Sequence, residues 1–223
     1  MMKIVRHALL EIFLVVMGIL IAIQLNNWNE SRKFKNEQKK FLVGLIDEFS
    51  SDLIRINTKI EQFGEINEII KSGKNLLIKS FLSEEDKNTF NITIDRFPIL
   101  TPLNKDVERN NFLISNGIIK SDSLKMMVLE YYELTSYHKE VQTKFGETLQ
   151  RLYTDQISPL VRFNQSSNTT KEYSLKKLQM SNTFNNALDL SIGYRNQAVL
   201  FLENQNEMAK KLIAIINKEF AKN

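Results

Sequence analysis

The sequence predicts an all-α protein in which an N-terminal transmembrane helix is followed by an elongated helical bundle of about three long helices plus short helices. One apolar run, residues 8–25, stands out from a chain whose mean hydropathy is slightly negative. Beyond that run, apolar residues recur every three, four or seven positions, which is the spacing of one helix face. Three prolines and seven glycines in 223 residues are too few for the turns of a β-rich architecture.

The composition also excludes several kinds of chemistry. The chain has no cysteine, which excludes disulfides, thiolate metal sites and cysteine nucleophiles. Its two histidines, His7 and His138, are too few for a multi-histidine zinc site. A net charge of +4 over mixed charges does not favour a nucleic-acid partner. The 25% charged and 43% hydrophobic residues are typical of a folded chain.

A short N-terminal tail, residues 1–7, leads into the apolar run over residues 8–25, which only Glu11 and Gln24 interrupt. As a helix this run is about 27 Å long, close to the ~30 Å hydrocarbon core of a bilayer. Glu11 lies one turn inside the start, so its carboxylate is expected to extend toward the headgroups. Trp28 follows the run and is expected to anchor the helix at the membrane interface. These features predict a single-pass membrane anchor.

A cleaved signal peptide and a buried core helix are the alternatives for this run. Residues 21–25 lack the small residues of a cleavage site, and a core helix is rarely apolar on every face. The charges leave the orientation open. Lys3 and Arg6 precede the run and five cations at positions 32–40 follow it, which favours a cytoplasmic C-terminal domain. A short basic tail is, however, also typical of a signal anchor whose domain is translocated.

Two features near the anchor concern partners. Gly18 and Ala22 form a small-xxx-small pair that lets two membrane helices approach closely, with Glu11 as a hydrogen-bonding group between them, so a homodimer is one expected assembly. A basic run after the anchor either contacts anionic headgroups or belongs to a solvated helix face that Glu30 and Glu37 balance. The basic residues are Arg32, Lys33, Lys35, Lys39 and Lys40.

Residues 11–30 resemble the N-terminal signature of a known family. They read Glu-Ile-x-Leu-Val-Val-x-Gly-Ile-Leu-Ile-Ala-x-Gln-x-Asn-Asn-Trp-Asn-Glu, with Leu10 where the family usually has glycine. A shorter match covers residues 118–124 and the Glu-Tyr-Tyr run at 130–132. The family comprises small single-pass membrane-anchored proteins of Bacteroidota and is classed as a domain of unknown function. The resemblance implies a bacterial inner-membrane protein with its C-terminal helical domain in the periplasm and with no known activity.

The domain after the anchor, residues 26–223, is predicted to begin with a long helix over about residues 30–82. Its apolar positions form one stripe, and polar residues fill the positions between them. No proline precedes position 98, so the anchor is expected to continue into this helix without a break. The predicted stripe comprises Phe34, Phe41, Leu45, Phe49, Leu53, Ile56, Ile60, Phe63, Ile70, Leu77 and Phe81.

A tip loop over about residues 83–106 is expected next. Ser83 is an N-cap for a short helical start, and two prolines at positions 98 and 102 end regular structure. A short helix over about residues 106–117 follows, with Gly117 as its C-cap.

Two further long helices complete the predicted bundle. One spans about residues 122–157 with Ser121 as its N-cap, and the other spans about residues 183–221. A loop over about residues 158–172 and a short helix at 173–180 separate them. The shared period near 3.5 predicts coiled-coil-like packing.

No motif in the chain predicts an enzyme, a cofactor or a metal site. Glycine-rich nucleotide loops, catalytic serine motifs and the zinc-binding His-Glu-x-x-His pattern are absent. Tyr131, His138 and Tyr194 lie on the inner stripes and are the candidates for a small-molecule site between helices. Core packing is the simpler interpretation of all three.

These observations favour a membrane-anchored, non-enzymatic helical protein of the bacterial cell envelope. It would act through contacts with the lipid bilayer and with another envelope protein or a second copy of itself. The alternative is a ligand-sensing helical bundle outside the cytoplasm, in which a bound small molecule shifts the helices and a partner membrane protein carries the signal.

Overall fold

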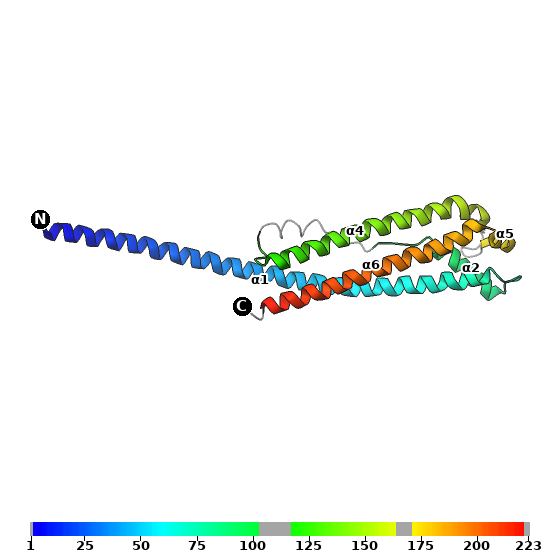
Figure 1. The fold of residues 1–223 in the computed structure, drawn as a ribbon, viewed down its shortest axis with the longest axis horizontal. Helices are drawn as coiled ribbons and strands as arrows, with labels where there is room; N and C mark the ends of the chain where they lie inside the picture. Colours follow the sequence, from blue (N-terminus) through cyan, green and yellow to red (C-terminus); the bar gives the residue numbers. More distant parts are fainter. Residues whose placement is uncertain (1, 103–116, 164–170, 221–223) are drawn as a thin grey trace.

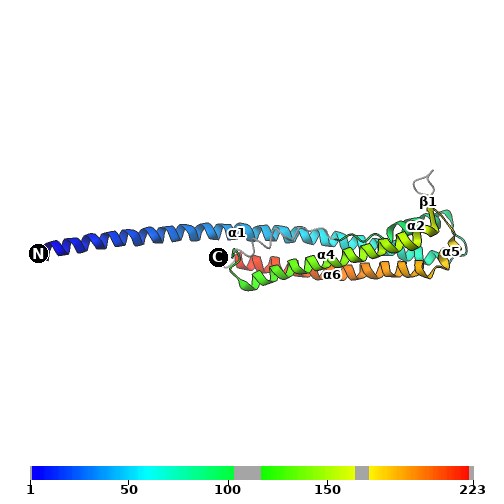
Figure 2. The ribbon, with the colours of Figure 1, turned by 90° about the horizontal axis from the view of Figure 1, so that it is seen from above.

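The computed structural model describes residues 2–102, 117–163 and 171–220. Helix α1, Met2–Leu76, projects alone at its N-terminal end and then enters a helical bundle (Figure 1). Helices α4 (Asp122–Leu152) and α6 (Asn182–Phe220) lie alongside the remainder of α1 (Figure 2). The all-α prediction of a long apolar N-terminal helix followed by an elongated bundle is confirmed.

The projecting part of α1 contains the apolar run. Every side chain over residues 11–33 is exposed, and the stretch is long and apolar enough to cross a membrane by length and composition. Burial begins at Phe34, where α1 enters the bundle. Since α1 is one helix of 75 residues, about 110 Å long, the apolar run and the first helix of the bundle are mechanically continuous.

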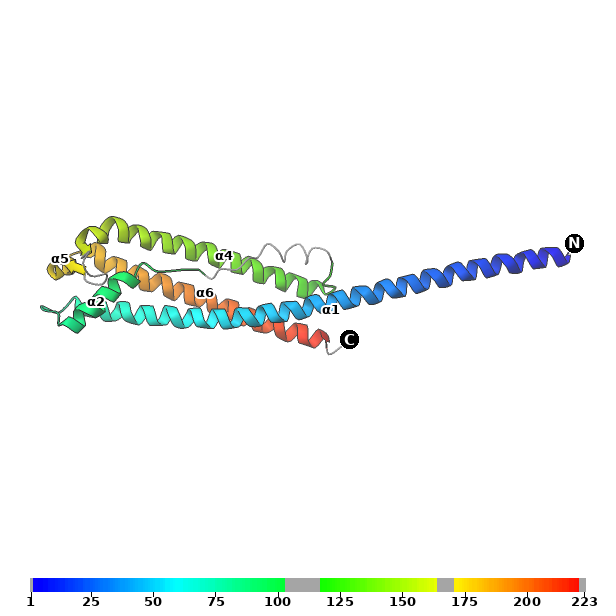
Figure 3. The ribbon, with the colours of Figure 1, turned by 180° about the vertical axis from the view of Figure 1, so that it is seen from behind.

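Helices α1 and α4 run away from the N-terminal end, and α6 runs back toward it (Figure 3). We call the end where α1 enters the bundle the base, and the opposite end the tip. The antiparallel pair α1 and α6 is joined by two side-chain amide hydrogen bonds. Asn206 donates to Asn57 at 2.8 Å, and ten residues farther along α1, Asn67 donates to Asn196 at 2.9 Å.

Helix α2, Glu84–Arg96, occupies slightly more than half of the stretch predicted as a tip loop over 83–106. That prediction was wrong in extent because the cap at Ser83 starts a full helix. The Ser83 hydroxyl accepts from the backbone N–H of Asp86, and the Asp86 carboxylate accepts from the N–H of Ser83, which completes a capping box. Phe90, Thr93 and Ile94 are then buried on one face of α2.

Helix α1 ends at Leu76 and not at the predicted residue 82. A turn at residues 77–78 and a non-helical segment, residues 79–83, connect α1 to α2, and Ser83 at the end of this segment is extended, with ψ of 170°. Leu77 and Leu82 remain buried in the core, but Phe81 does not. Phe81 was predicted on the buried stripe and is 75% exposed, because the helical phase that placed it there is lost after Leu76.

Residues 97–102, which we call the strap, lead from α2 back toward the base. Leu100 is buried with Ile56 and Phe63 of α1 and with Leu149 of α4. The Thr101 hydroxyl accepts from the Lys59 ammonium at 2.7 Å. The predicted short helix over 106–117 lies almost wholly outside the described residues; its predicted cap, Gly117, has a φ of +70°.

The connection from α4 to α6 forms the rest of the tip. A π-helical turn, Tyr153–Ile157, and a 3₁₀ turn, Ser158–Leu160, continue α4. The antiparallel strands β1 (Val161–Phe163) and β2 (Lys171–Tyr173) pair within the predicted loop, with Val161 opposite Tyr173. Helix α5, Leu175–Gln179, corresponds to the short helix predicted near 173–180.

Three apolar clusters fill the bundle from base to tip. The basal cluster is centred on Phe49, Leu124 and Leu212, and the middle cluster on Phe63 and Leu202. The tip cluster packs α2, α5 and the ends of the long helices around Phe90, Phe97, Leu178 and Phe184.

Helices α4 and α6 pack through two stacked ring pairs. His138 stacks on Phe201 with ring centroids 4.5 Å apart, and Phe145 stacks on Tyr194 at 4.1 Å. The partners on each helix are seven residues apart, so both pairs share one antiparallel register.

Candidate functional site

A polar layer crosses the bundle core above the basal cluster. The hydroxyl of Tyr131 on α4 donates to the carboxylate of Asp52 on α1 at 2.7 Å. The amide of Gln205 on α6 donates to the hydroxyl of Thr135 at 2.9 Å and, more weakly, to the Tyr131 oxygen at 3.4 Å. These four side chains are buried, so one hydrogen-bonded network ties the three long helices together.

Burial and charge define the protonation of this layer. Burial, together with the nearby Asp52 carboxylate, raises the pKa of Tyr131 far above its ordinary value of 10.0. The phenol therefore keeps its proton and remains a donor to Asp52. Asp52 also accepts from the Arg55 guanidinium at 2.5 Å, which places a cation at the solvent side of the layer.

His138 lies one helical turn beyond Thr135. Burial lowers the pKa of His138 below its ordinary value, and a side-chain hydrogen bond with Gln205 opposes this shift. Its Nδ1 and the Oε1 of Gln142, a further turn along α4, are buried without a hydrogen-bond partner among the described residues. The neutral imidazole is therefore held by stacking on Phe201 and by Gln205.

The structure brings together two of the three ligand candidates. Tyr131 and His138 share Gln205, whereas Tyr194 lies eleven residues from Gln205 along α6, about 16 Å away, where it stacks on Phe145. Two shallow hollows lie on the outer face of α4 and the π-helical turn, lined by residues between Gly146 and Gln156. None of the three candidates lines either hollow. In the described part of the chain, no group of three acidic or histidine side chains is placed to hold a metal ion.

Arg195 is a buried charge that the sequence analysis did not single out. One nitrogen of its guanidinium donates to the carbonyls of Arg96 at 2.9 Å, Phe97 at 2.9 Å and Ile99 at 2.5 Å. The other donates to the carbonyl of Ser191 at 3.1 Å and to its hydroxyl. Burial lowers the pKa of Arg195 to about 10, so it stays charged at neutral pH. Arg195 thus closes the C-terminal end of α2 and holds the start of the strap.

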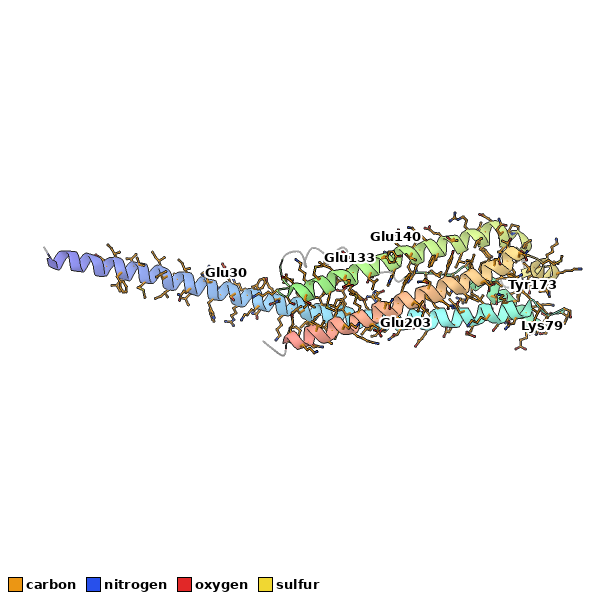
Figure 4. All side chains as sticks on the ribbon, viewed as in Figure 1. Glu30, Lys79, Glu133, Glu140, Tyr173 and Glu203 are labelled. Carbon is orange, nitrogen blue, oxygen red and sulfur yellow. The ribbon has the colours of Figure 1, made fainter. Side chains whose placement is uncertain are left out.

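Three large apolar side chains are exposed together at the tip. Ile78 is 88% exposed, and Phe81 and Met180 are each 75% exposed. We call these three residues the tip patch. They belong to two loops that meet there, because the Gln179 amide donates to the Lys79 carbonyl at 2.7 Å. Figure 4 places Lys79 at the end of the bundle farthest from the N-terminus.

Buried leucines beside the tip patch hold its two loops against the core, and ion pairs lie around the patch. Leu77 and Leu82 flank the exposed residues 78–81, Leu178 precedes Met180 by two positions, and all three leucines pack into the tip cluster. On the rim, Lys79 pairs with Asp86 at 2.9 Å, Lys87 pairs with Glu84 at 2.6 Å, and Lys74 pairs with Asp189. An apolar centre with a rim of mixed charge is the usual anatomy of a protein–protein interface.

The residues predicted to act at the membrane all lie on the projecting part of α1. Trp28 is 63% exposed, and the Arg32 guanidinium lies 5.8 Å from its ring centroid. Glu11, Gly18 and Ala22 are also exposed. Their spacing of seven and four residues places the three on one face of the helix.

The match to a known family covers most of α1, all of α2 and the first half of α4. The model of a family of unknown function, DUF6090, matches residues 11–137, more than half of the chain. The chain belongs to this family. The resemblance to a domain of unknown function is thereby confirmed, whereas the Bacteroidota source and the signature remain predictions. No curated protein and no solved structure matches the chain.

The region that matches DUF6090 contains only part of the tip. It includes the apolar helix, α2 and the first half of α4 with Tyr131. It also includes Ile78 and Phe81, but not Met180, His138 or Arg195.

Proposed function

We propose that this DUF6090 protein is a membrane-anchored, non-enzymatic helical protein that acts through protein–protein contacts made by its tip patch. The apolar run of α1 is the single-pass anchor, and the continuous helix sets the bundle at a fixed distance from the bilayer. The resemblance of residues 11–30 supports a bacterial inner membrane with the bundle in the periplasm. The partner would then be another protein of the cell envelope.

The observation that carries this proposal is the exposure of Ile78, Phe81 and Met180 at adjoining loops. Single exposed apolar residues are common on protein surfaces, but a group of large ones marks an interaction site more often than chance. Covering each of these side chains stabilises a complex by about 1.5–3 kcal/mol.

The tip patch is also preorganised for binding. The Gln179–Lys79 hydrogen bond joins the two loops, and the capping box at Ser83 fixes the turn that carries Phe81. A rigid surface loses little conformational entropy on binding, so more of the contact energy remains as affinity.

Site-specific photocrosslinking in living cells tests this proposal. A photoreactive amino acid replaces Ile78, Phe81 or Met180 in the full-length chain, and replaces Ile54 in the control. Ile54 is 69% exposed on the side of α1, away from the tip. The expected result is one shared adduct from the three tip positions and none from position 54.

A second variant shows whether the adduct depends on the patch. With the photoreactive group at position 180, Phe81→Ser should reduce the adduct at least several-fold, whereas Ile54→Ser should leave it unchanged. Equal adducts from tip and side positions, or an adduct insensitive to Phe81→Ser, would contradict the proposal.

The ligand-sensing bundle is a second candidate, and the polar layer is the observation that favours it. Tyr131, Gln205 and His138 connect all three long helices, and two buried acceptors beside them lack partners among the described residues. A molecule that bound there would shift α4 against α1 and α6. A thermal-shift screen of the detergent-solubilised full-length chain against metabolites tests it. Stabilisation that Tyr131→Phe removes would support sensing, and no stabilisation by any compound would contradict it.

A further inference from the structure

Five basic side chains follow Trp28 on α1, at and just beyond the point where the helix enters the bundle. We call them the basic collar: Arg32, Lys33, Lys35, Lys39 and Lys40. All five are exposed, and none forms an ion pair within the described part of the chain. In the bundle, Lys71, Lys74, Lys79, Lys87 and Lys144 each pair with an acidic residue, whereas other lysines, such as Lys125, Lys139 and Lys210, form no ion pair within the described residues either.

The collar lies on one side of the helix. At about 100° per residue, its five positions fall within an arc of about 160°. Phe34 and Phe41, which turn toward the bundle, lie opposite the centre of this arc. Glu30 and Glu37 lie outside the arc, both on the same flank, between Lys33 and the phenylalanine side. Both acidic residues are three or four positions from Lys33, but neither forms an ion pair with the collar in the described part of the chain, so five cations against two acidic residues leave this side of α1 with an excess of positive charge.

Arg32 connects the collar to the apolar run. Its guanidinium lies 5.8 Å from the ring centroid of Trp28, one turn nearer the N-terminus, so the cation turns back toward the apolar end of α1. Along the helix axis, Arg32, Lys33 and Lys35 are about 6, 8 and 10 Å beyond Trp28. With Trp28 at the lipid–water boundary, these three cations lie within about one Debye length of the headgroups.

We propose that the basic collar binds the phosphate groups of anionic phospholipids and so enriches these lipids around the anchor. Arg32, Lys33 and Lys35 supply most of the attraction, because Lys39 and Lys40 are about 16–18 Å beyond Trp28. Contact on one side of α1 would also bias the direction in which the projecting part of α1 tilts relative to the membrane. The inference rests on the proposed membrane anchor and adds a lipid class to it.

The single tryptophan of the chain makes the test direct, because all indole fluorescence comes from Trp28. The full-length protein is reconstituted in phosphatidylcholine vesicles with an equal mole fraction of brominated phosphatidylcholine or brominated phosphatidylglycerol. Brominated lipids quench the fluorescence of an indole that they contact. We expect the anionic quencher to be stronger by about twofold or more, and high salt to remove the difference.

Two matched charge-removal variants identify the residues responsible. The triple variant Arg32→Gln, Lys33→Gln and Lys35→Gln should quench equally with both lipids. The control Lys87→Gln, Lys176→Gln and Lys177→Gln removes the same charge at the tip and should keep the preference. Inorganic phosphate at constant ionic strength should not compete, because the site requires phosphates held at the membrane surface.

The outcomes separate this inference from the anchor on which it rests. Equal quenching by both lipids in the unmodified protein, or a preference that survives the triple variant, would contradict lipid binding by the collar. Either result would leave the proposed membrane anchor unaffected. If neither lipid quenched the fluorescence, both the proposed membrane anchor and the proposed lipid binding by the collar would be contradicted.

Discussion

The hydroxyl of Tyr131 on α4 donates a 2.7 Å hydrogen bond to the carboxylate of Asp52 on α1, across the buried core of the bundle. The two residues are 79 positions apart, on helices that run in the same direction. Buried polar contacts of this kind select one register of neighbouring helices, since a shifted helix would leave the carboxylate without this donor.

Tyr131→Phe should therefore destabilise the bundle by about 1–3 kcal/mol, because it removes a donor from a buried carboxylate while keeping the ring. Urea unfolding of the full-length protein in detergent, followed by circular dichroism, measures the change. Tyr132→Phe is the control. The Tyr132 hydroxyl donates to the half-buried Glu48 at 3.1 Å, so its loss should be smaller. An equal effect of the two variants would contradict the role assigned to the layer.

The lowered pKa of His138 predicts how the stability of the bundle depends on pH. Its folded-state pKa lies below the ordinary 6.5, so the unfolded chain takes up the proton more readily. Stability should be complete above pH 6.5 and should fall as the pH drops through that value, by at most about 1.4 kcal/mol per pH unit. Unfolding curves at a series of pH values measure this slope. His138→Gln removes the titration, so the slope just below pH 6.5 should flatten; a slope that persists would assign it to other groups.

The long helices could be predicted from the sequence because their apolar stripes are regular. Helix α6 spans Asn182–Phe220 against a predicted 183–221, and α4 begins one residue after its predicted cap, Ser121. An apolar stripe indicates which face of a helix is buried, but it does not indicate the residue at which the helix ends. Leu77 and Phe81 both continue the stripe of α1, and only the first is buried.

The candidate site could be predicted only in part. Tyr131 and His138 were found because they lie on the inner stripe of one helix. Arg195 and the tip patch depend on contacts between distant segments. Arg195 caps α2 from a helix about 100 residues later, and Met180 joins Phe81 only through the Gln179–Lys79 hydrogen bond.

Arg195→Met should destabilise the tip by about 2–4 kcal/mol, because the carbonyls of Arg96, Phe97 and Ile99 lose a buried donor. The loss should be local, so hydrogen exchange should accelerate most at the amides of α2. Arg195→Lys keeps the charge but not the fork of donors, and should recover only part of the stability. Uniform acceleration along the whole bundle would contradict a local role at the strap.

Gly146 tests the contact between the strap and α4. A Cβ at this position would lie 2.6 Å from the Leu100 carbonyl oxygen, so Gly146→Ala should displace the strap and lower the free energy of unfolding by about 1–3 kcal/mol. Gly44→Ala is the matched control in α1, where a Cβ meets nothing within 4 Å. It should stabilise the helix by about 0.5–1 kcal/mol, since glycine disfavours a helix interior. Thermal unfolding of both variants measures the opposite signs, and stabilisation by both would show that the strap leaves room beside α4.

Gly18 and Ala22 predict that the proposed membrane anchor self-associates. Both lie on the face of α1 that also holds Glu11, so two helices crossing there would approach closely and bring the two carboxyl groups together. Gly18→Leu should reduce the dimer fraction of the full-length chain in bilayers several-fold, as measured by energy transfer between labelled copies. Val16→Leu adds bulk to the opposite face and should have little effect. If the two variants dimerise equally well, the small residues do not form the interface, and association, where it occurs, belongs to the bundle.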